Sequence, residues 1–277
     1  MKTRSVRRTR RTLQLAGAGA AALMALSACS SSSDTDNAND TSGKSDTPAS
    51  PKLSGTVTVF AAASLKESFT TLGKEFEKQH PGTKVSFNFG GSDALAASIT
   101  SGAPADVFAA ASPKTMAIVT DKKDAVGAPA TFVRNQLEIA TVPGNPHKVA
   151  SLKDLTKSGL KVVLCDKTVP CGAAAQKALD AGGLKLTPVS YEQDVKGALN
   201  KVQLKEADAA VVYKTDVKAA GGKVEGVEFP ESAKAINDYP IALLKNAEHA
   251  ETAKAFIALV QSAEGQQVLS KAGFLKP

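Results

Sequence analysis

Residues 55–80 read GTVTVFAAASLKESFTTLGKEFEKQH, and this stretch decides the fold. Its first part, 55–60, is a run of mostly β-branched residues and predicts a strand. Apolar residues at helical spacing follow after a turn of small residues: Leu65, Phe69, Leu72 and Phe76. This spacing predicts an amphipathic helix that ends before Pro81-Gly82. A strand therefore leads directly into a helix.

The alternation continues along the chain. Further strands are expected at 84–89, 105–109, 135–142, 161–164, 208–213 and 239–244. Further helices are expected at 94–101, 193–202, 249–262 and 264–271. One more helix is expected to begin at Pro113, and another is expected to follow 169–172 and to end at Ala181. Strands that alternate with helices favour α/β lobes with mainly parallel sheets. We expect one lobe from 53–134 and 239–277 and a second from 135–238, joined by crossovers near 135–142 and 239–244.

The N-terminal segment has the composition of an export signal. Residues 1–28 carry six basic residues and no acidic one, and 13–28 form a short, Ala-rich apolar run. This layout predicts a signal peptide. Leu26-Ser27-Ala28-Cys29 resembles a lipobox, which implies cleavage before Cys29 and a lipid on its thiol. Ordinary cleavage with a free Cys29 is the alternative to lipidation. The segment also contains an arginine pair, so export by either the twin-arginine route or the general secretory route is possible.

Residues 30–52 contain no large apolar side chain. Such a segment cannot bury enough surface to offset its ordering entropy, so 29–52 is predicted to be a disordered tether. A lipid on Cys29 would then hold the folded body at the outer face of the cell membrane.

The formal charge of +7 belongs to the export signal. Without residues 1–28 the chain keeps 28 basic and 27 acidic residues, so the body is nearly neutral. Only 5% of residues are aromatic, and there are three His, three Cys and no Trp. We therefore expect neither a nucleic-acid partner nor a His/Cys metal centre, and no cofactor.

Four expected strand–helix junctions share one chemistry. They lie at 61–64, 90–93, 169–172 and 193–196, and all consist mostly of small or apolar residues. Helix N-termini carry unpaired N–H donors, so converging junctions would bind an anion without Lys or Arg. Ser64 and Ser92 are expected as N-caps, and Pro170 in a first turn. Simple capping is the alternative role for each serine.

Five segments along the body resemble, in order, those of the molybdate-binding proteins of ABC transporters. They are VFAAASL (59–65), SGAPADVF (101–108), VPCG (169–172), DVKGAL (194–199) and VVY (211–213). The resemblance covers 53–277. It implies the type II periplasmic binding protein fold, in which two α/β lobes close on ligand in the cleft between them.

The resemblance also implies a ligand set. Ser64 and Ser92 match two serines that bind the oxyanion, and Tyr213 matches a tyrosine whose hydroxyl reaches it. Cys171 and Val195 match positions that donate a backbone N–H. Cys171 stands where the family often has Ala, and a backbone contact tolerates that exchange.

Molybdate suits such a set because it is a dianion near pH 7 with acceptor oxygens and no proton to give. Its site needs only donors, and backbone N–H, Ser and Tyr hydroxyls supply them. The resemblance thus implies a monomeric lipoprotein that delivers molybdate, with tungstate as an equally fitting ligand, to an ABC permease and its ATPase. Sulfate carries the same charge and is the main alternative ligand.

Two cysteines remain once Cys29 is acylated. Cys165 and Cys171 lie six residues apart in an exported chain, which predicts a disulfide. Free thiols, or a metal or redox site, are the alternatives.

An exported serine hydrolase is the distant alternative. Its nucleophile would need a histidine base, but His80, His147 and His249 all lie beside turns or helix ends. No G-x-S-x-G is present. Iron binding would need more tyrosines or carboxylates than this site supplies. We expect a binding protein and no enzyme.

Overall fold

The computed structural model describes residues 53–277. The predicted signal peptide, the lipidation site Cys29 and the tether 29–52 lie outside this range. None of the helices within it is long and apolar enough to cross a membrane.

One sheet forms the centre of the first lobe. Its strand order is β2 (Thr83–Gly90), β1 (Gly55–Ala62), β3 (Val107–Ala109), β10 (Asn237–Leu244) and β4 (Ala125–Asn135). β1 is parallel to β2 and β3, whereas β10 is antiparallel to β3 and β4. The helices of this lobe are α1 (Lys66–Gln79), α2 (Ser92–Thr100), α3 (Pro113–Asp121), α7 (Ala250–Gln261) and α8 (Ala263–Ala272).

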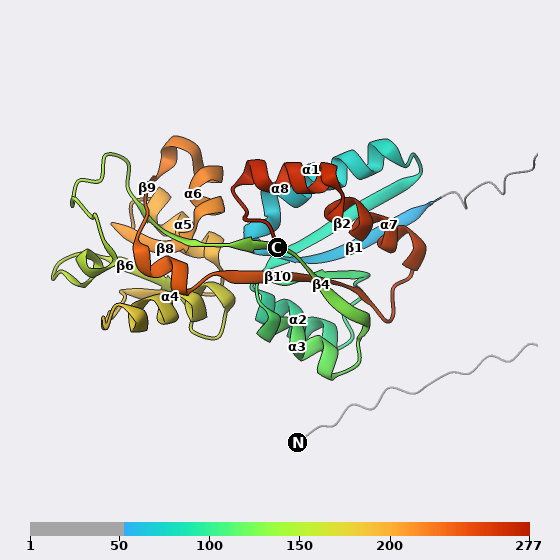
Figure 1. Ribbon diagram of the computed structural model, residues 1–277, viewed down its shortest axis with the longest axis horizontal. Coiled ribbons are helices and arrows are strands. Elements are labelled where there is room, and N and C mark those ends of the chain that lie inside the picture. Colours follow the sequence, from blue (N-terminus) through green and yellow to red (C-terminus); the bar gives the residue numbers. More distant parts are fainter. Residues whose placement is uncertain (1–52) are drawn as a thin grey trace, which may run out of the picture. The chain divides into compact units, whose positions relative to one another are not determined.

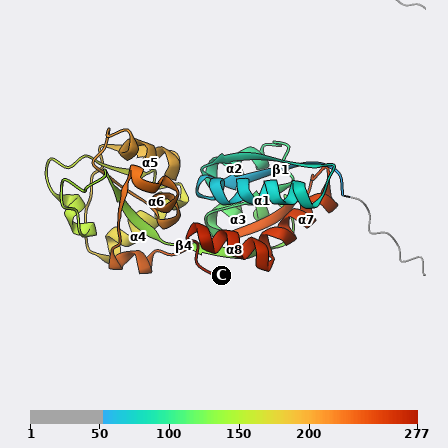
Figure 2. The same cartoon turned by 90° about the horizontal axis from the view of Figure 1, so that it is seen from above.

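Helices cover both faces of this sheet (Figures 1 and 2). Val57 and Val59 of β1 belong to the core under α1, α7 and α8, and Phe60 belongs to the core under α2 and α3. Alternate residues of a strand point to opposite faces, so β1 contributes to both cores. Phe69, Leu72 and Phe76 of α1 are fully buried, as their helical spacing predicts.

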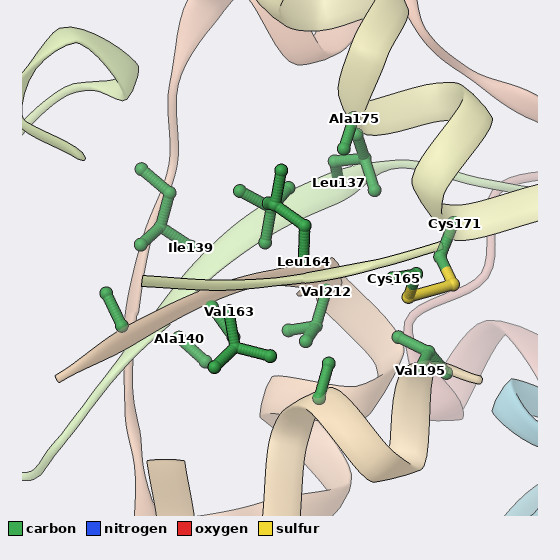
Figure 3. Close-up of a cluster of buried hydrophobic side chains, with 14 of the residues drawn as sticks. Leu137, Ile139, Ala140, Val163, Leu164, Cys165, Cys171, Ala175, Val195 and Val212 are labelled. Carbon is green, nitrogen blue, oxygen red and sulfur yellow. A yellow bond between two sulfur atoms is a disulfide. The ribbon is translucent and has the colours of Figure 1, made fainter. Parts of the chain in front are cut away.

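A second sheet forms the centre of the other lobe. Its order is β7 (Ser190–Glu192), β6 (Val162–Cys165), β8 (Ala209–Tyr213), β5 (Leu137–Thr141) and β9 (Glu225–Val227). β6 is parallel to β7 and β8, and β5 is antiparallel to β8 and β9. The helices are α4 (Pro170–Ala181), α5 (Val195–Gln203) and α6 (Lys214–Ala220), and short 3-10 helices lie at Leu152–Thr156, Gly221–Lys223 and Pro230–Lys234. Figure 3 shows part of its apolar core.

The first crossover differs from the prediction. The strand predicted at 135–142 is present as β5, but β4 precedes it in the other sheet and ends at Asn135, so this crossover joins two strands. The prediction missed β4 because Gly127 and Pro129 interrupt it and most of its first half is exposed. The second crossover enters β10 at Asn237, which pairs directly with Asn135. The lobe boundaries at 134/135 and 238/239 stay a prediction.

A disulfide joins Cys165 to Cys171, with an S–S distance of 2.12 Å. Cys165 ends β6 and Cys171 lies in the first turn of α4, so the bond closes the loop that leads into this helix (Figure 3). The predicted disulfide is confirmed in the structure.

Candidate oxyanion site

All five residues implied by the sequence resemblance line one small cavity. Its volume is about 20 Å³. Ser64 and Ser92 come from the first lobe, and Cys171, Val195 and Tyr213 come from the second. The other lining residues are Ala62, Ala63, Gly90, Gly91, Ala111, Val169, Pro170 and Asp194. The cavity therefore lies where the carboxyl ends of strands meet helix starts, as expected for an α/β binding site.

Two helices of the second lobe begin at the cavity. Val169 is the N-cap of α4 and Pro170 its first residue, as predicted, which places Cys171 in the first turn. Val195 is the first residue of α5, after the N-cap Asp194. The first N–H groups of a helix have no partner within it, so Cys171 and Val195 are backbone donors at this wall.

The two serines are not N-caps, and that prediction was wrong. The N-cap of α2 is Gly91, Ser92 is its first residue, and Ser64 lies inside the 3-10 helix Ala63–Leu65. Ser92 Oγ instead accepts the Ala111 N–H at 3.0 Å, and Ser64 Oγ lies 2.8 Å from Tyr239 Oη. Both serines are at most 4% exposed. Their hydroxyls contact distant segments, so capping does not explain them.

Tyr213 ends β8 with its side chain 1% exposed. Burial raises the pKa of this phenol well above its ordinary value, so the hydroxyl keeps its proton. The side-chain amide of Asn237 donates to Tyr213 Oη at 2.7 Å. The phenol thus accepts a bond from behind and retains a proton to give.

Sequence reasoning missed three residues behind the cavity. They are Asn135 and Asn237 on the crossover strands, and Tyr239, whose hydroxyl contacts Ser64. The Ser64–Tyr239 contact spans 175 residues of sequence, and the Asn135–Tyr239 contact spans 104. No local motif signals such contacts; the only hint was the placement of these polar residues at the crossovers.

The cavity wall carries donors without positive side chains. Among the described residues that line it, none is Lys, Arg or His. Asp194 is its one acidic residue, and its Oδ1 accepts the Gly197 N–H at 2.9 Å within α5. The nearby Lys196 ammonium is 2.8 Å from Glu67 and 3.0 Å from Asp216, so its charge is already paired.

The serines have no arrangement for nucleophilic catalysis. Their hydroxyl partners are Tyr239 and a backbone N–H, whereas a nucleophile needs a basic imidazole. The three histidines lie elsewhere: His80 packs on Phe76, His147 is 3.3 Å from Asp208, and His249 adjoins Gly55. Within 53–277, no three His, Cys, Asp or Glu side chains gather in a metal-binding cluster.

Comparison with known proteins agrees with this geometry. The sequence model of the bacterial extracellular solute-binding protein family matches residues 57–275. The molybdate-binding protein of Mycobacterium tuberculosis is 43% identical over 231 residues, which cover 83% of this chain and 88% of that protein. Such identity over this length shows common family membership.

Solved structures show the same two-lobed fold. The periplasmic molybdate-binding protein of Azotobacter vinelandii aligns with a TM-score of 0.70 at 21% identity, over 80% of this chain and 99% of that one. The sulfate-binding protein SubI of Mycobacterium tuberculosis aligns with a TM-score of 0.68 at 18% identity, over 79% of this chain and 86% of that one. These identities establish the periplasmic binding protein fold alone. The family match and the 43% identical relative go further: the chain belongs to the bacterial extracellular solute-binding proteins, in the family that includes the molybdate-binding proteins of ABC transporters.

Proposed function

We propose that this protein captures molybdate, and equally tungstate, through neutral hydrogen-bond donors in the cavity between its lobes. One observation carries the proposal: the hydroxyls of Ser92 and Tyr213 each accept a bond from a donor behind them and face a cavity that also holds two helix N-termini. Each of these hydroxyls has its proton left for the cavity. A fully deprotonated tetrahedral dianion needs such a set of donors.

The 43% identity to a molybdate-binding protein favours molybdate over sulfate. Sulfate stays the second candidate because a sulfate-binding protein has the same fold at a similar TM-score. Both are dianions, so the size of the closed cavity must separate them.

Thermal unfolding of the full chain with molybdate, tungstate, sulfate and phosphate tests the ligand. A ligand at a thousand times its dissociation constant stabilises a protein by about 4 kcal/mol, which raises the melting temperature by several degrees. We expect this shift with molybdate and tungstate. A shift with sulfate and none with molybdate would replace the proposed ligand.

Delivery and anchoring complete the proposal. Residues 26–29 resemble a lipobox, and membership of an extracellular solute-binding family supports export. We infer a monomeric lipoprotein, held by a lipid on Cys29 at the outer face of the membrane, that passes its ligand to an ABC permease and its ATPase. Mass spectrometry of the N-terminal peptide tests the anchor: it should begin at an acylated Cys29, and Cys29→Ala should release the protein from membranes.

A further inference from the structure

Asn135 and Asn237 face each other as register partners on β4 and β10, where the two crossovers meet the second lobe. Both are buried, with exposures of 0% and 7%. Neither lines the cavity, yet each donates to a tyrosine hydroxyl: Asn237 to Tyr213 and Asn135 to Tyr239. The pair therefore stands directly behind the site.

The orientation of the Asn237 amide follows from its neighbours. Its Nδ2 lies 2.9 Å from the carbonyl oxygen of Ala111 and 3.4 Å from that of Pro170. A carbonyl oxygen can only accept, so the NH₂ group must face these atoms and the nearby Tyr213 Oη at 2.7 Å. Asn237 thus donates to Tyr213, which must direct its own proton elsewhere.

The Asn135 amide is oriented by the same reasoning. Its Oδ1 accepts the Gln136 N–H at 3.0 Å, which leaves Nδ2 to donate to Thr215 Oγ1 at 2.9 Å and to Tyr239 Oη at 3.3 Å. Either hydroxyl of the 2.8 Å Ser64–Tyr239 pair can be the donor, and the bond that Tyr239 accepts from Asn135 favours Tyr239 in that role. In this arrangement Ser64 accepts a bond and keeps its own proton for the cavity.

We propose that Asn237 and Asn135 are specificity-determining positioning residues, which bias the direction of the hydrogen bonds so that Tyr213 and Ser64 present their protons to the ligand. The site then selects a fully deprotonated dianion over an oxyanion that carries a proton. A proton on the ligand would meet hydroxyls with no lone pair turned toward it. This inference rests on the proposed oxyanion function. It identifies the residues that orient the Tyr213 and Ser64 hydroxyls as donors toward the ligand.

The selectivity between molybdate and inorganic phosphate is the readout, because phosphate carries at least one proton at pH 7. In Asn237→Ala, Tyr213 Oη is free to turn a lone pair to the cavity. We expect molybdate affinity of the full chain to fall about tenfold, as for the loss of one buried hydrogen bond, and phosphate affinity to stay or rise. The affinity ratio should therefore fall at least tenfold.

Asn145→Ala is the matched control. Asn145 also makes two hydrogen bonds, to the backbone of Val149, but lies away from the cavity. This variant should leave the molybdate-to-phosphate ratio unchanged. The Tyr213→Phe background supplies a double-mutant cycle: without the hydroxyl, Asn237→Ala should have no further effect on the ratio.

Asn135→Ala tests the second route and keeps the proposal falsifiable if Asn237→Ala does not fold. It should lower the ratio in the wild-type background and have no effect in Ser64→Ala. Equal losses of both affinities in these variants, or effects that persist without the hydroxyls, would reduce both asparagines to structural roles and overturn the inference. A wild-type chain that binds none of the four oxyanions would overturn the proposed function and this inference with it.

Discussion

Lys196 of α5 and Glu67 of α1 form an ion pair of 2.8 Å that joins the two lobes beside the cavity. The Lys196 side chain is 18% exposed and that of Glu67 is 50% exposed, so solvent screens the attraction. The pair can form only while the lobes are together, and it therefore favours the closed arrangement.

Glu67→Gln is expected to weaken molybdate binding about two- to fivefold, since an exposed pair contributes up to about 1 kcal/mol. Titration calorimetry at low and high salt measures this, and the difference from wild type should shrink at high salt. Glu206→Gln is the control, because Glu206 pairs with Lys201 within one lobe. A similar loss of affinity in both variants would rule out a role of the Lys196 pair in closure.

Gly91 marks a close approach between the lobes. A Cβ at this position would lie 2.6 Å from the carbonyl oxygen of Gln193, across the cleft. Gly91→Ala should therefore hold the lobes apart and lower affinity about ten- to hundredfold, the cost of an overlap of this kind. Because φ is −61° and ψ is 130°, Ala fits the backbone and the ligand-free protein should melt normally. A Cβ at Gly222 would meet no atom within 4 Å, and Gly222 does not line the cavity, so Gly222→Ala should bind like wild type.

Ser92→Ala tests whether the hydroxyl binds ligand. Molybdate affinity should fall about tenfold or more, because a charge-assisted hydrogen bond is lost. The free energy of unfolding should also fall by about 1–2 kcal/mol, since the Ala111 N–H loses its buried acceptor. Ser98→Ala removes a hydroxyl from the same helix that bonds only to the Ala94 carbonyl, and should change neither quantity strongly. Unchanged affinity in Ser92→Ala would leave the serine with a structural role only.

Asp216 gives the stability a specific pH dependence. Burial at 0% exposure raises the pKa of its carboxyl from 3.8 to about 6. A raised acid pKa means that the folded protein binds this proton more tightly than the unfolded chain. The contribution of the Asp216 carboxyl to the free energy of unfolding is therefore fully present below about pH 3.8. It is lost as the pH rises through about 6.

Asp216→Asn should remove this component and keep an oxygen that can accept the Tyr213 N–H. The unfolding free energies of wild type and variant, measured by denaturant titration between pH 4 and 7, should diverge by up to about 3 kcal/mol. Parallel curves would show that Asp216 does not titrate in this range.

The Cys165–Cys171 bond closes a short loop, so its loss should cost about 2 kcal/mol in the chain-entropy description. The paired Ser variant should melt at lower temperature and bind molybdate less tightly, because Cys171 also offers its N–H at the cavity. Non-reducing mass spectrometry of the exported protein should show a 165–171 linkage. Two alkylatable thiols would contradict it.

Most strands and helices were predictable because local patterns encode them, whereas the short β7, β9 and α6 were missed. The alternation of Val57 and Val59 with polar residues, and the helical spacing from Leu65 to Phe76, each occur within one element. Pro170 likewise marks the start of α4 from local chemistry alone. β4 was not predictable, since its pairing with β10 is a long-range contact that overrides Gly127 and Pro129.

Only the residues that line the cavity were predictable from the sequence, whereas their hydrogen-bond partners were not. Ser64, Ser92 and Tyr213 lie in motifs that can be recognised along the chain, and the structure brings them to one cavity. Their hydrogen-bond partners come from Ala111, Tyr239 and Asn237, far away in sequence. The direction of each hydrogen bond depends on these partners, so it required the folded arrangement.

Cys171 forms the disulfide bond with Cys165 and also lines the cavity. The shape of the receptor is therefore tied to the redox potential around it. In a reducing compartment the first turn of α4 would lack this covalent bond, and we expect the Cys171 side of the cavity to be held less firmly. Oxidation after export would then complete the proposed site in the compartment where the ligand is bound.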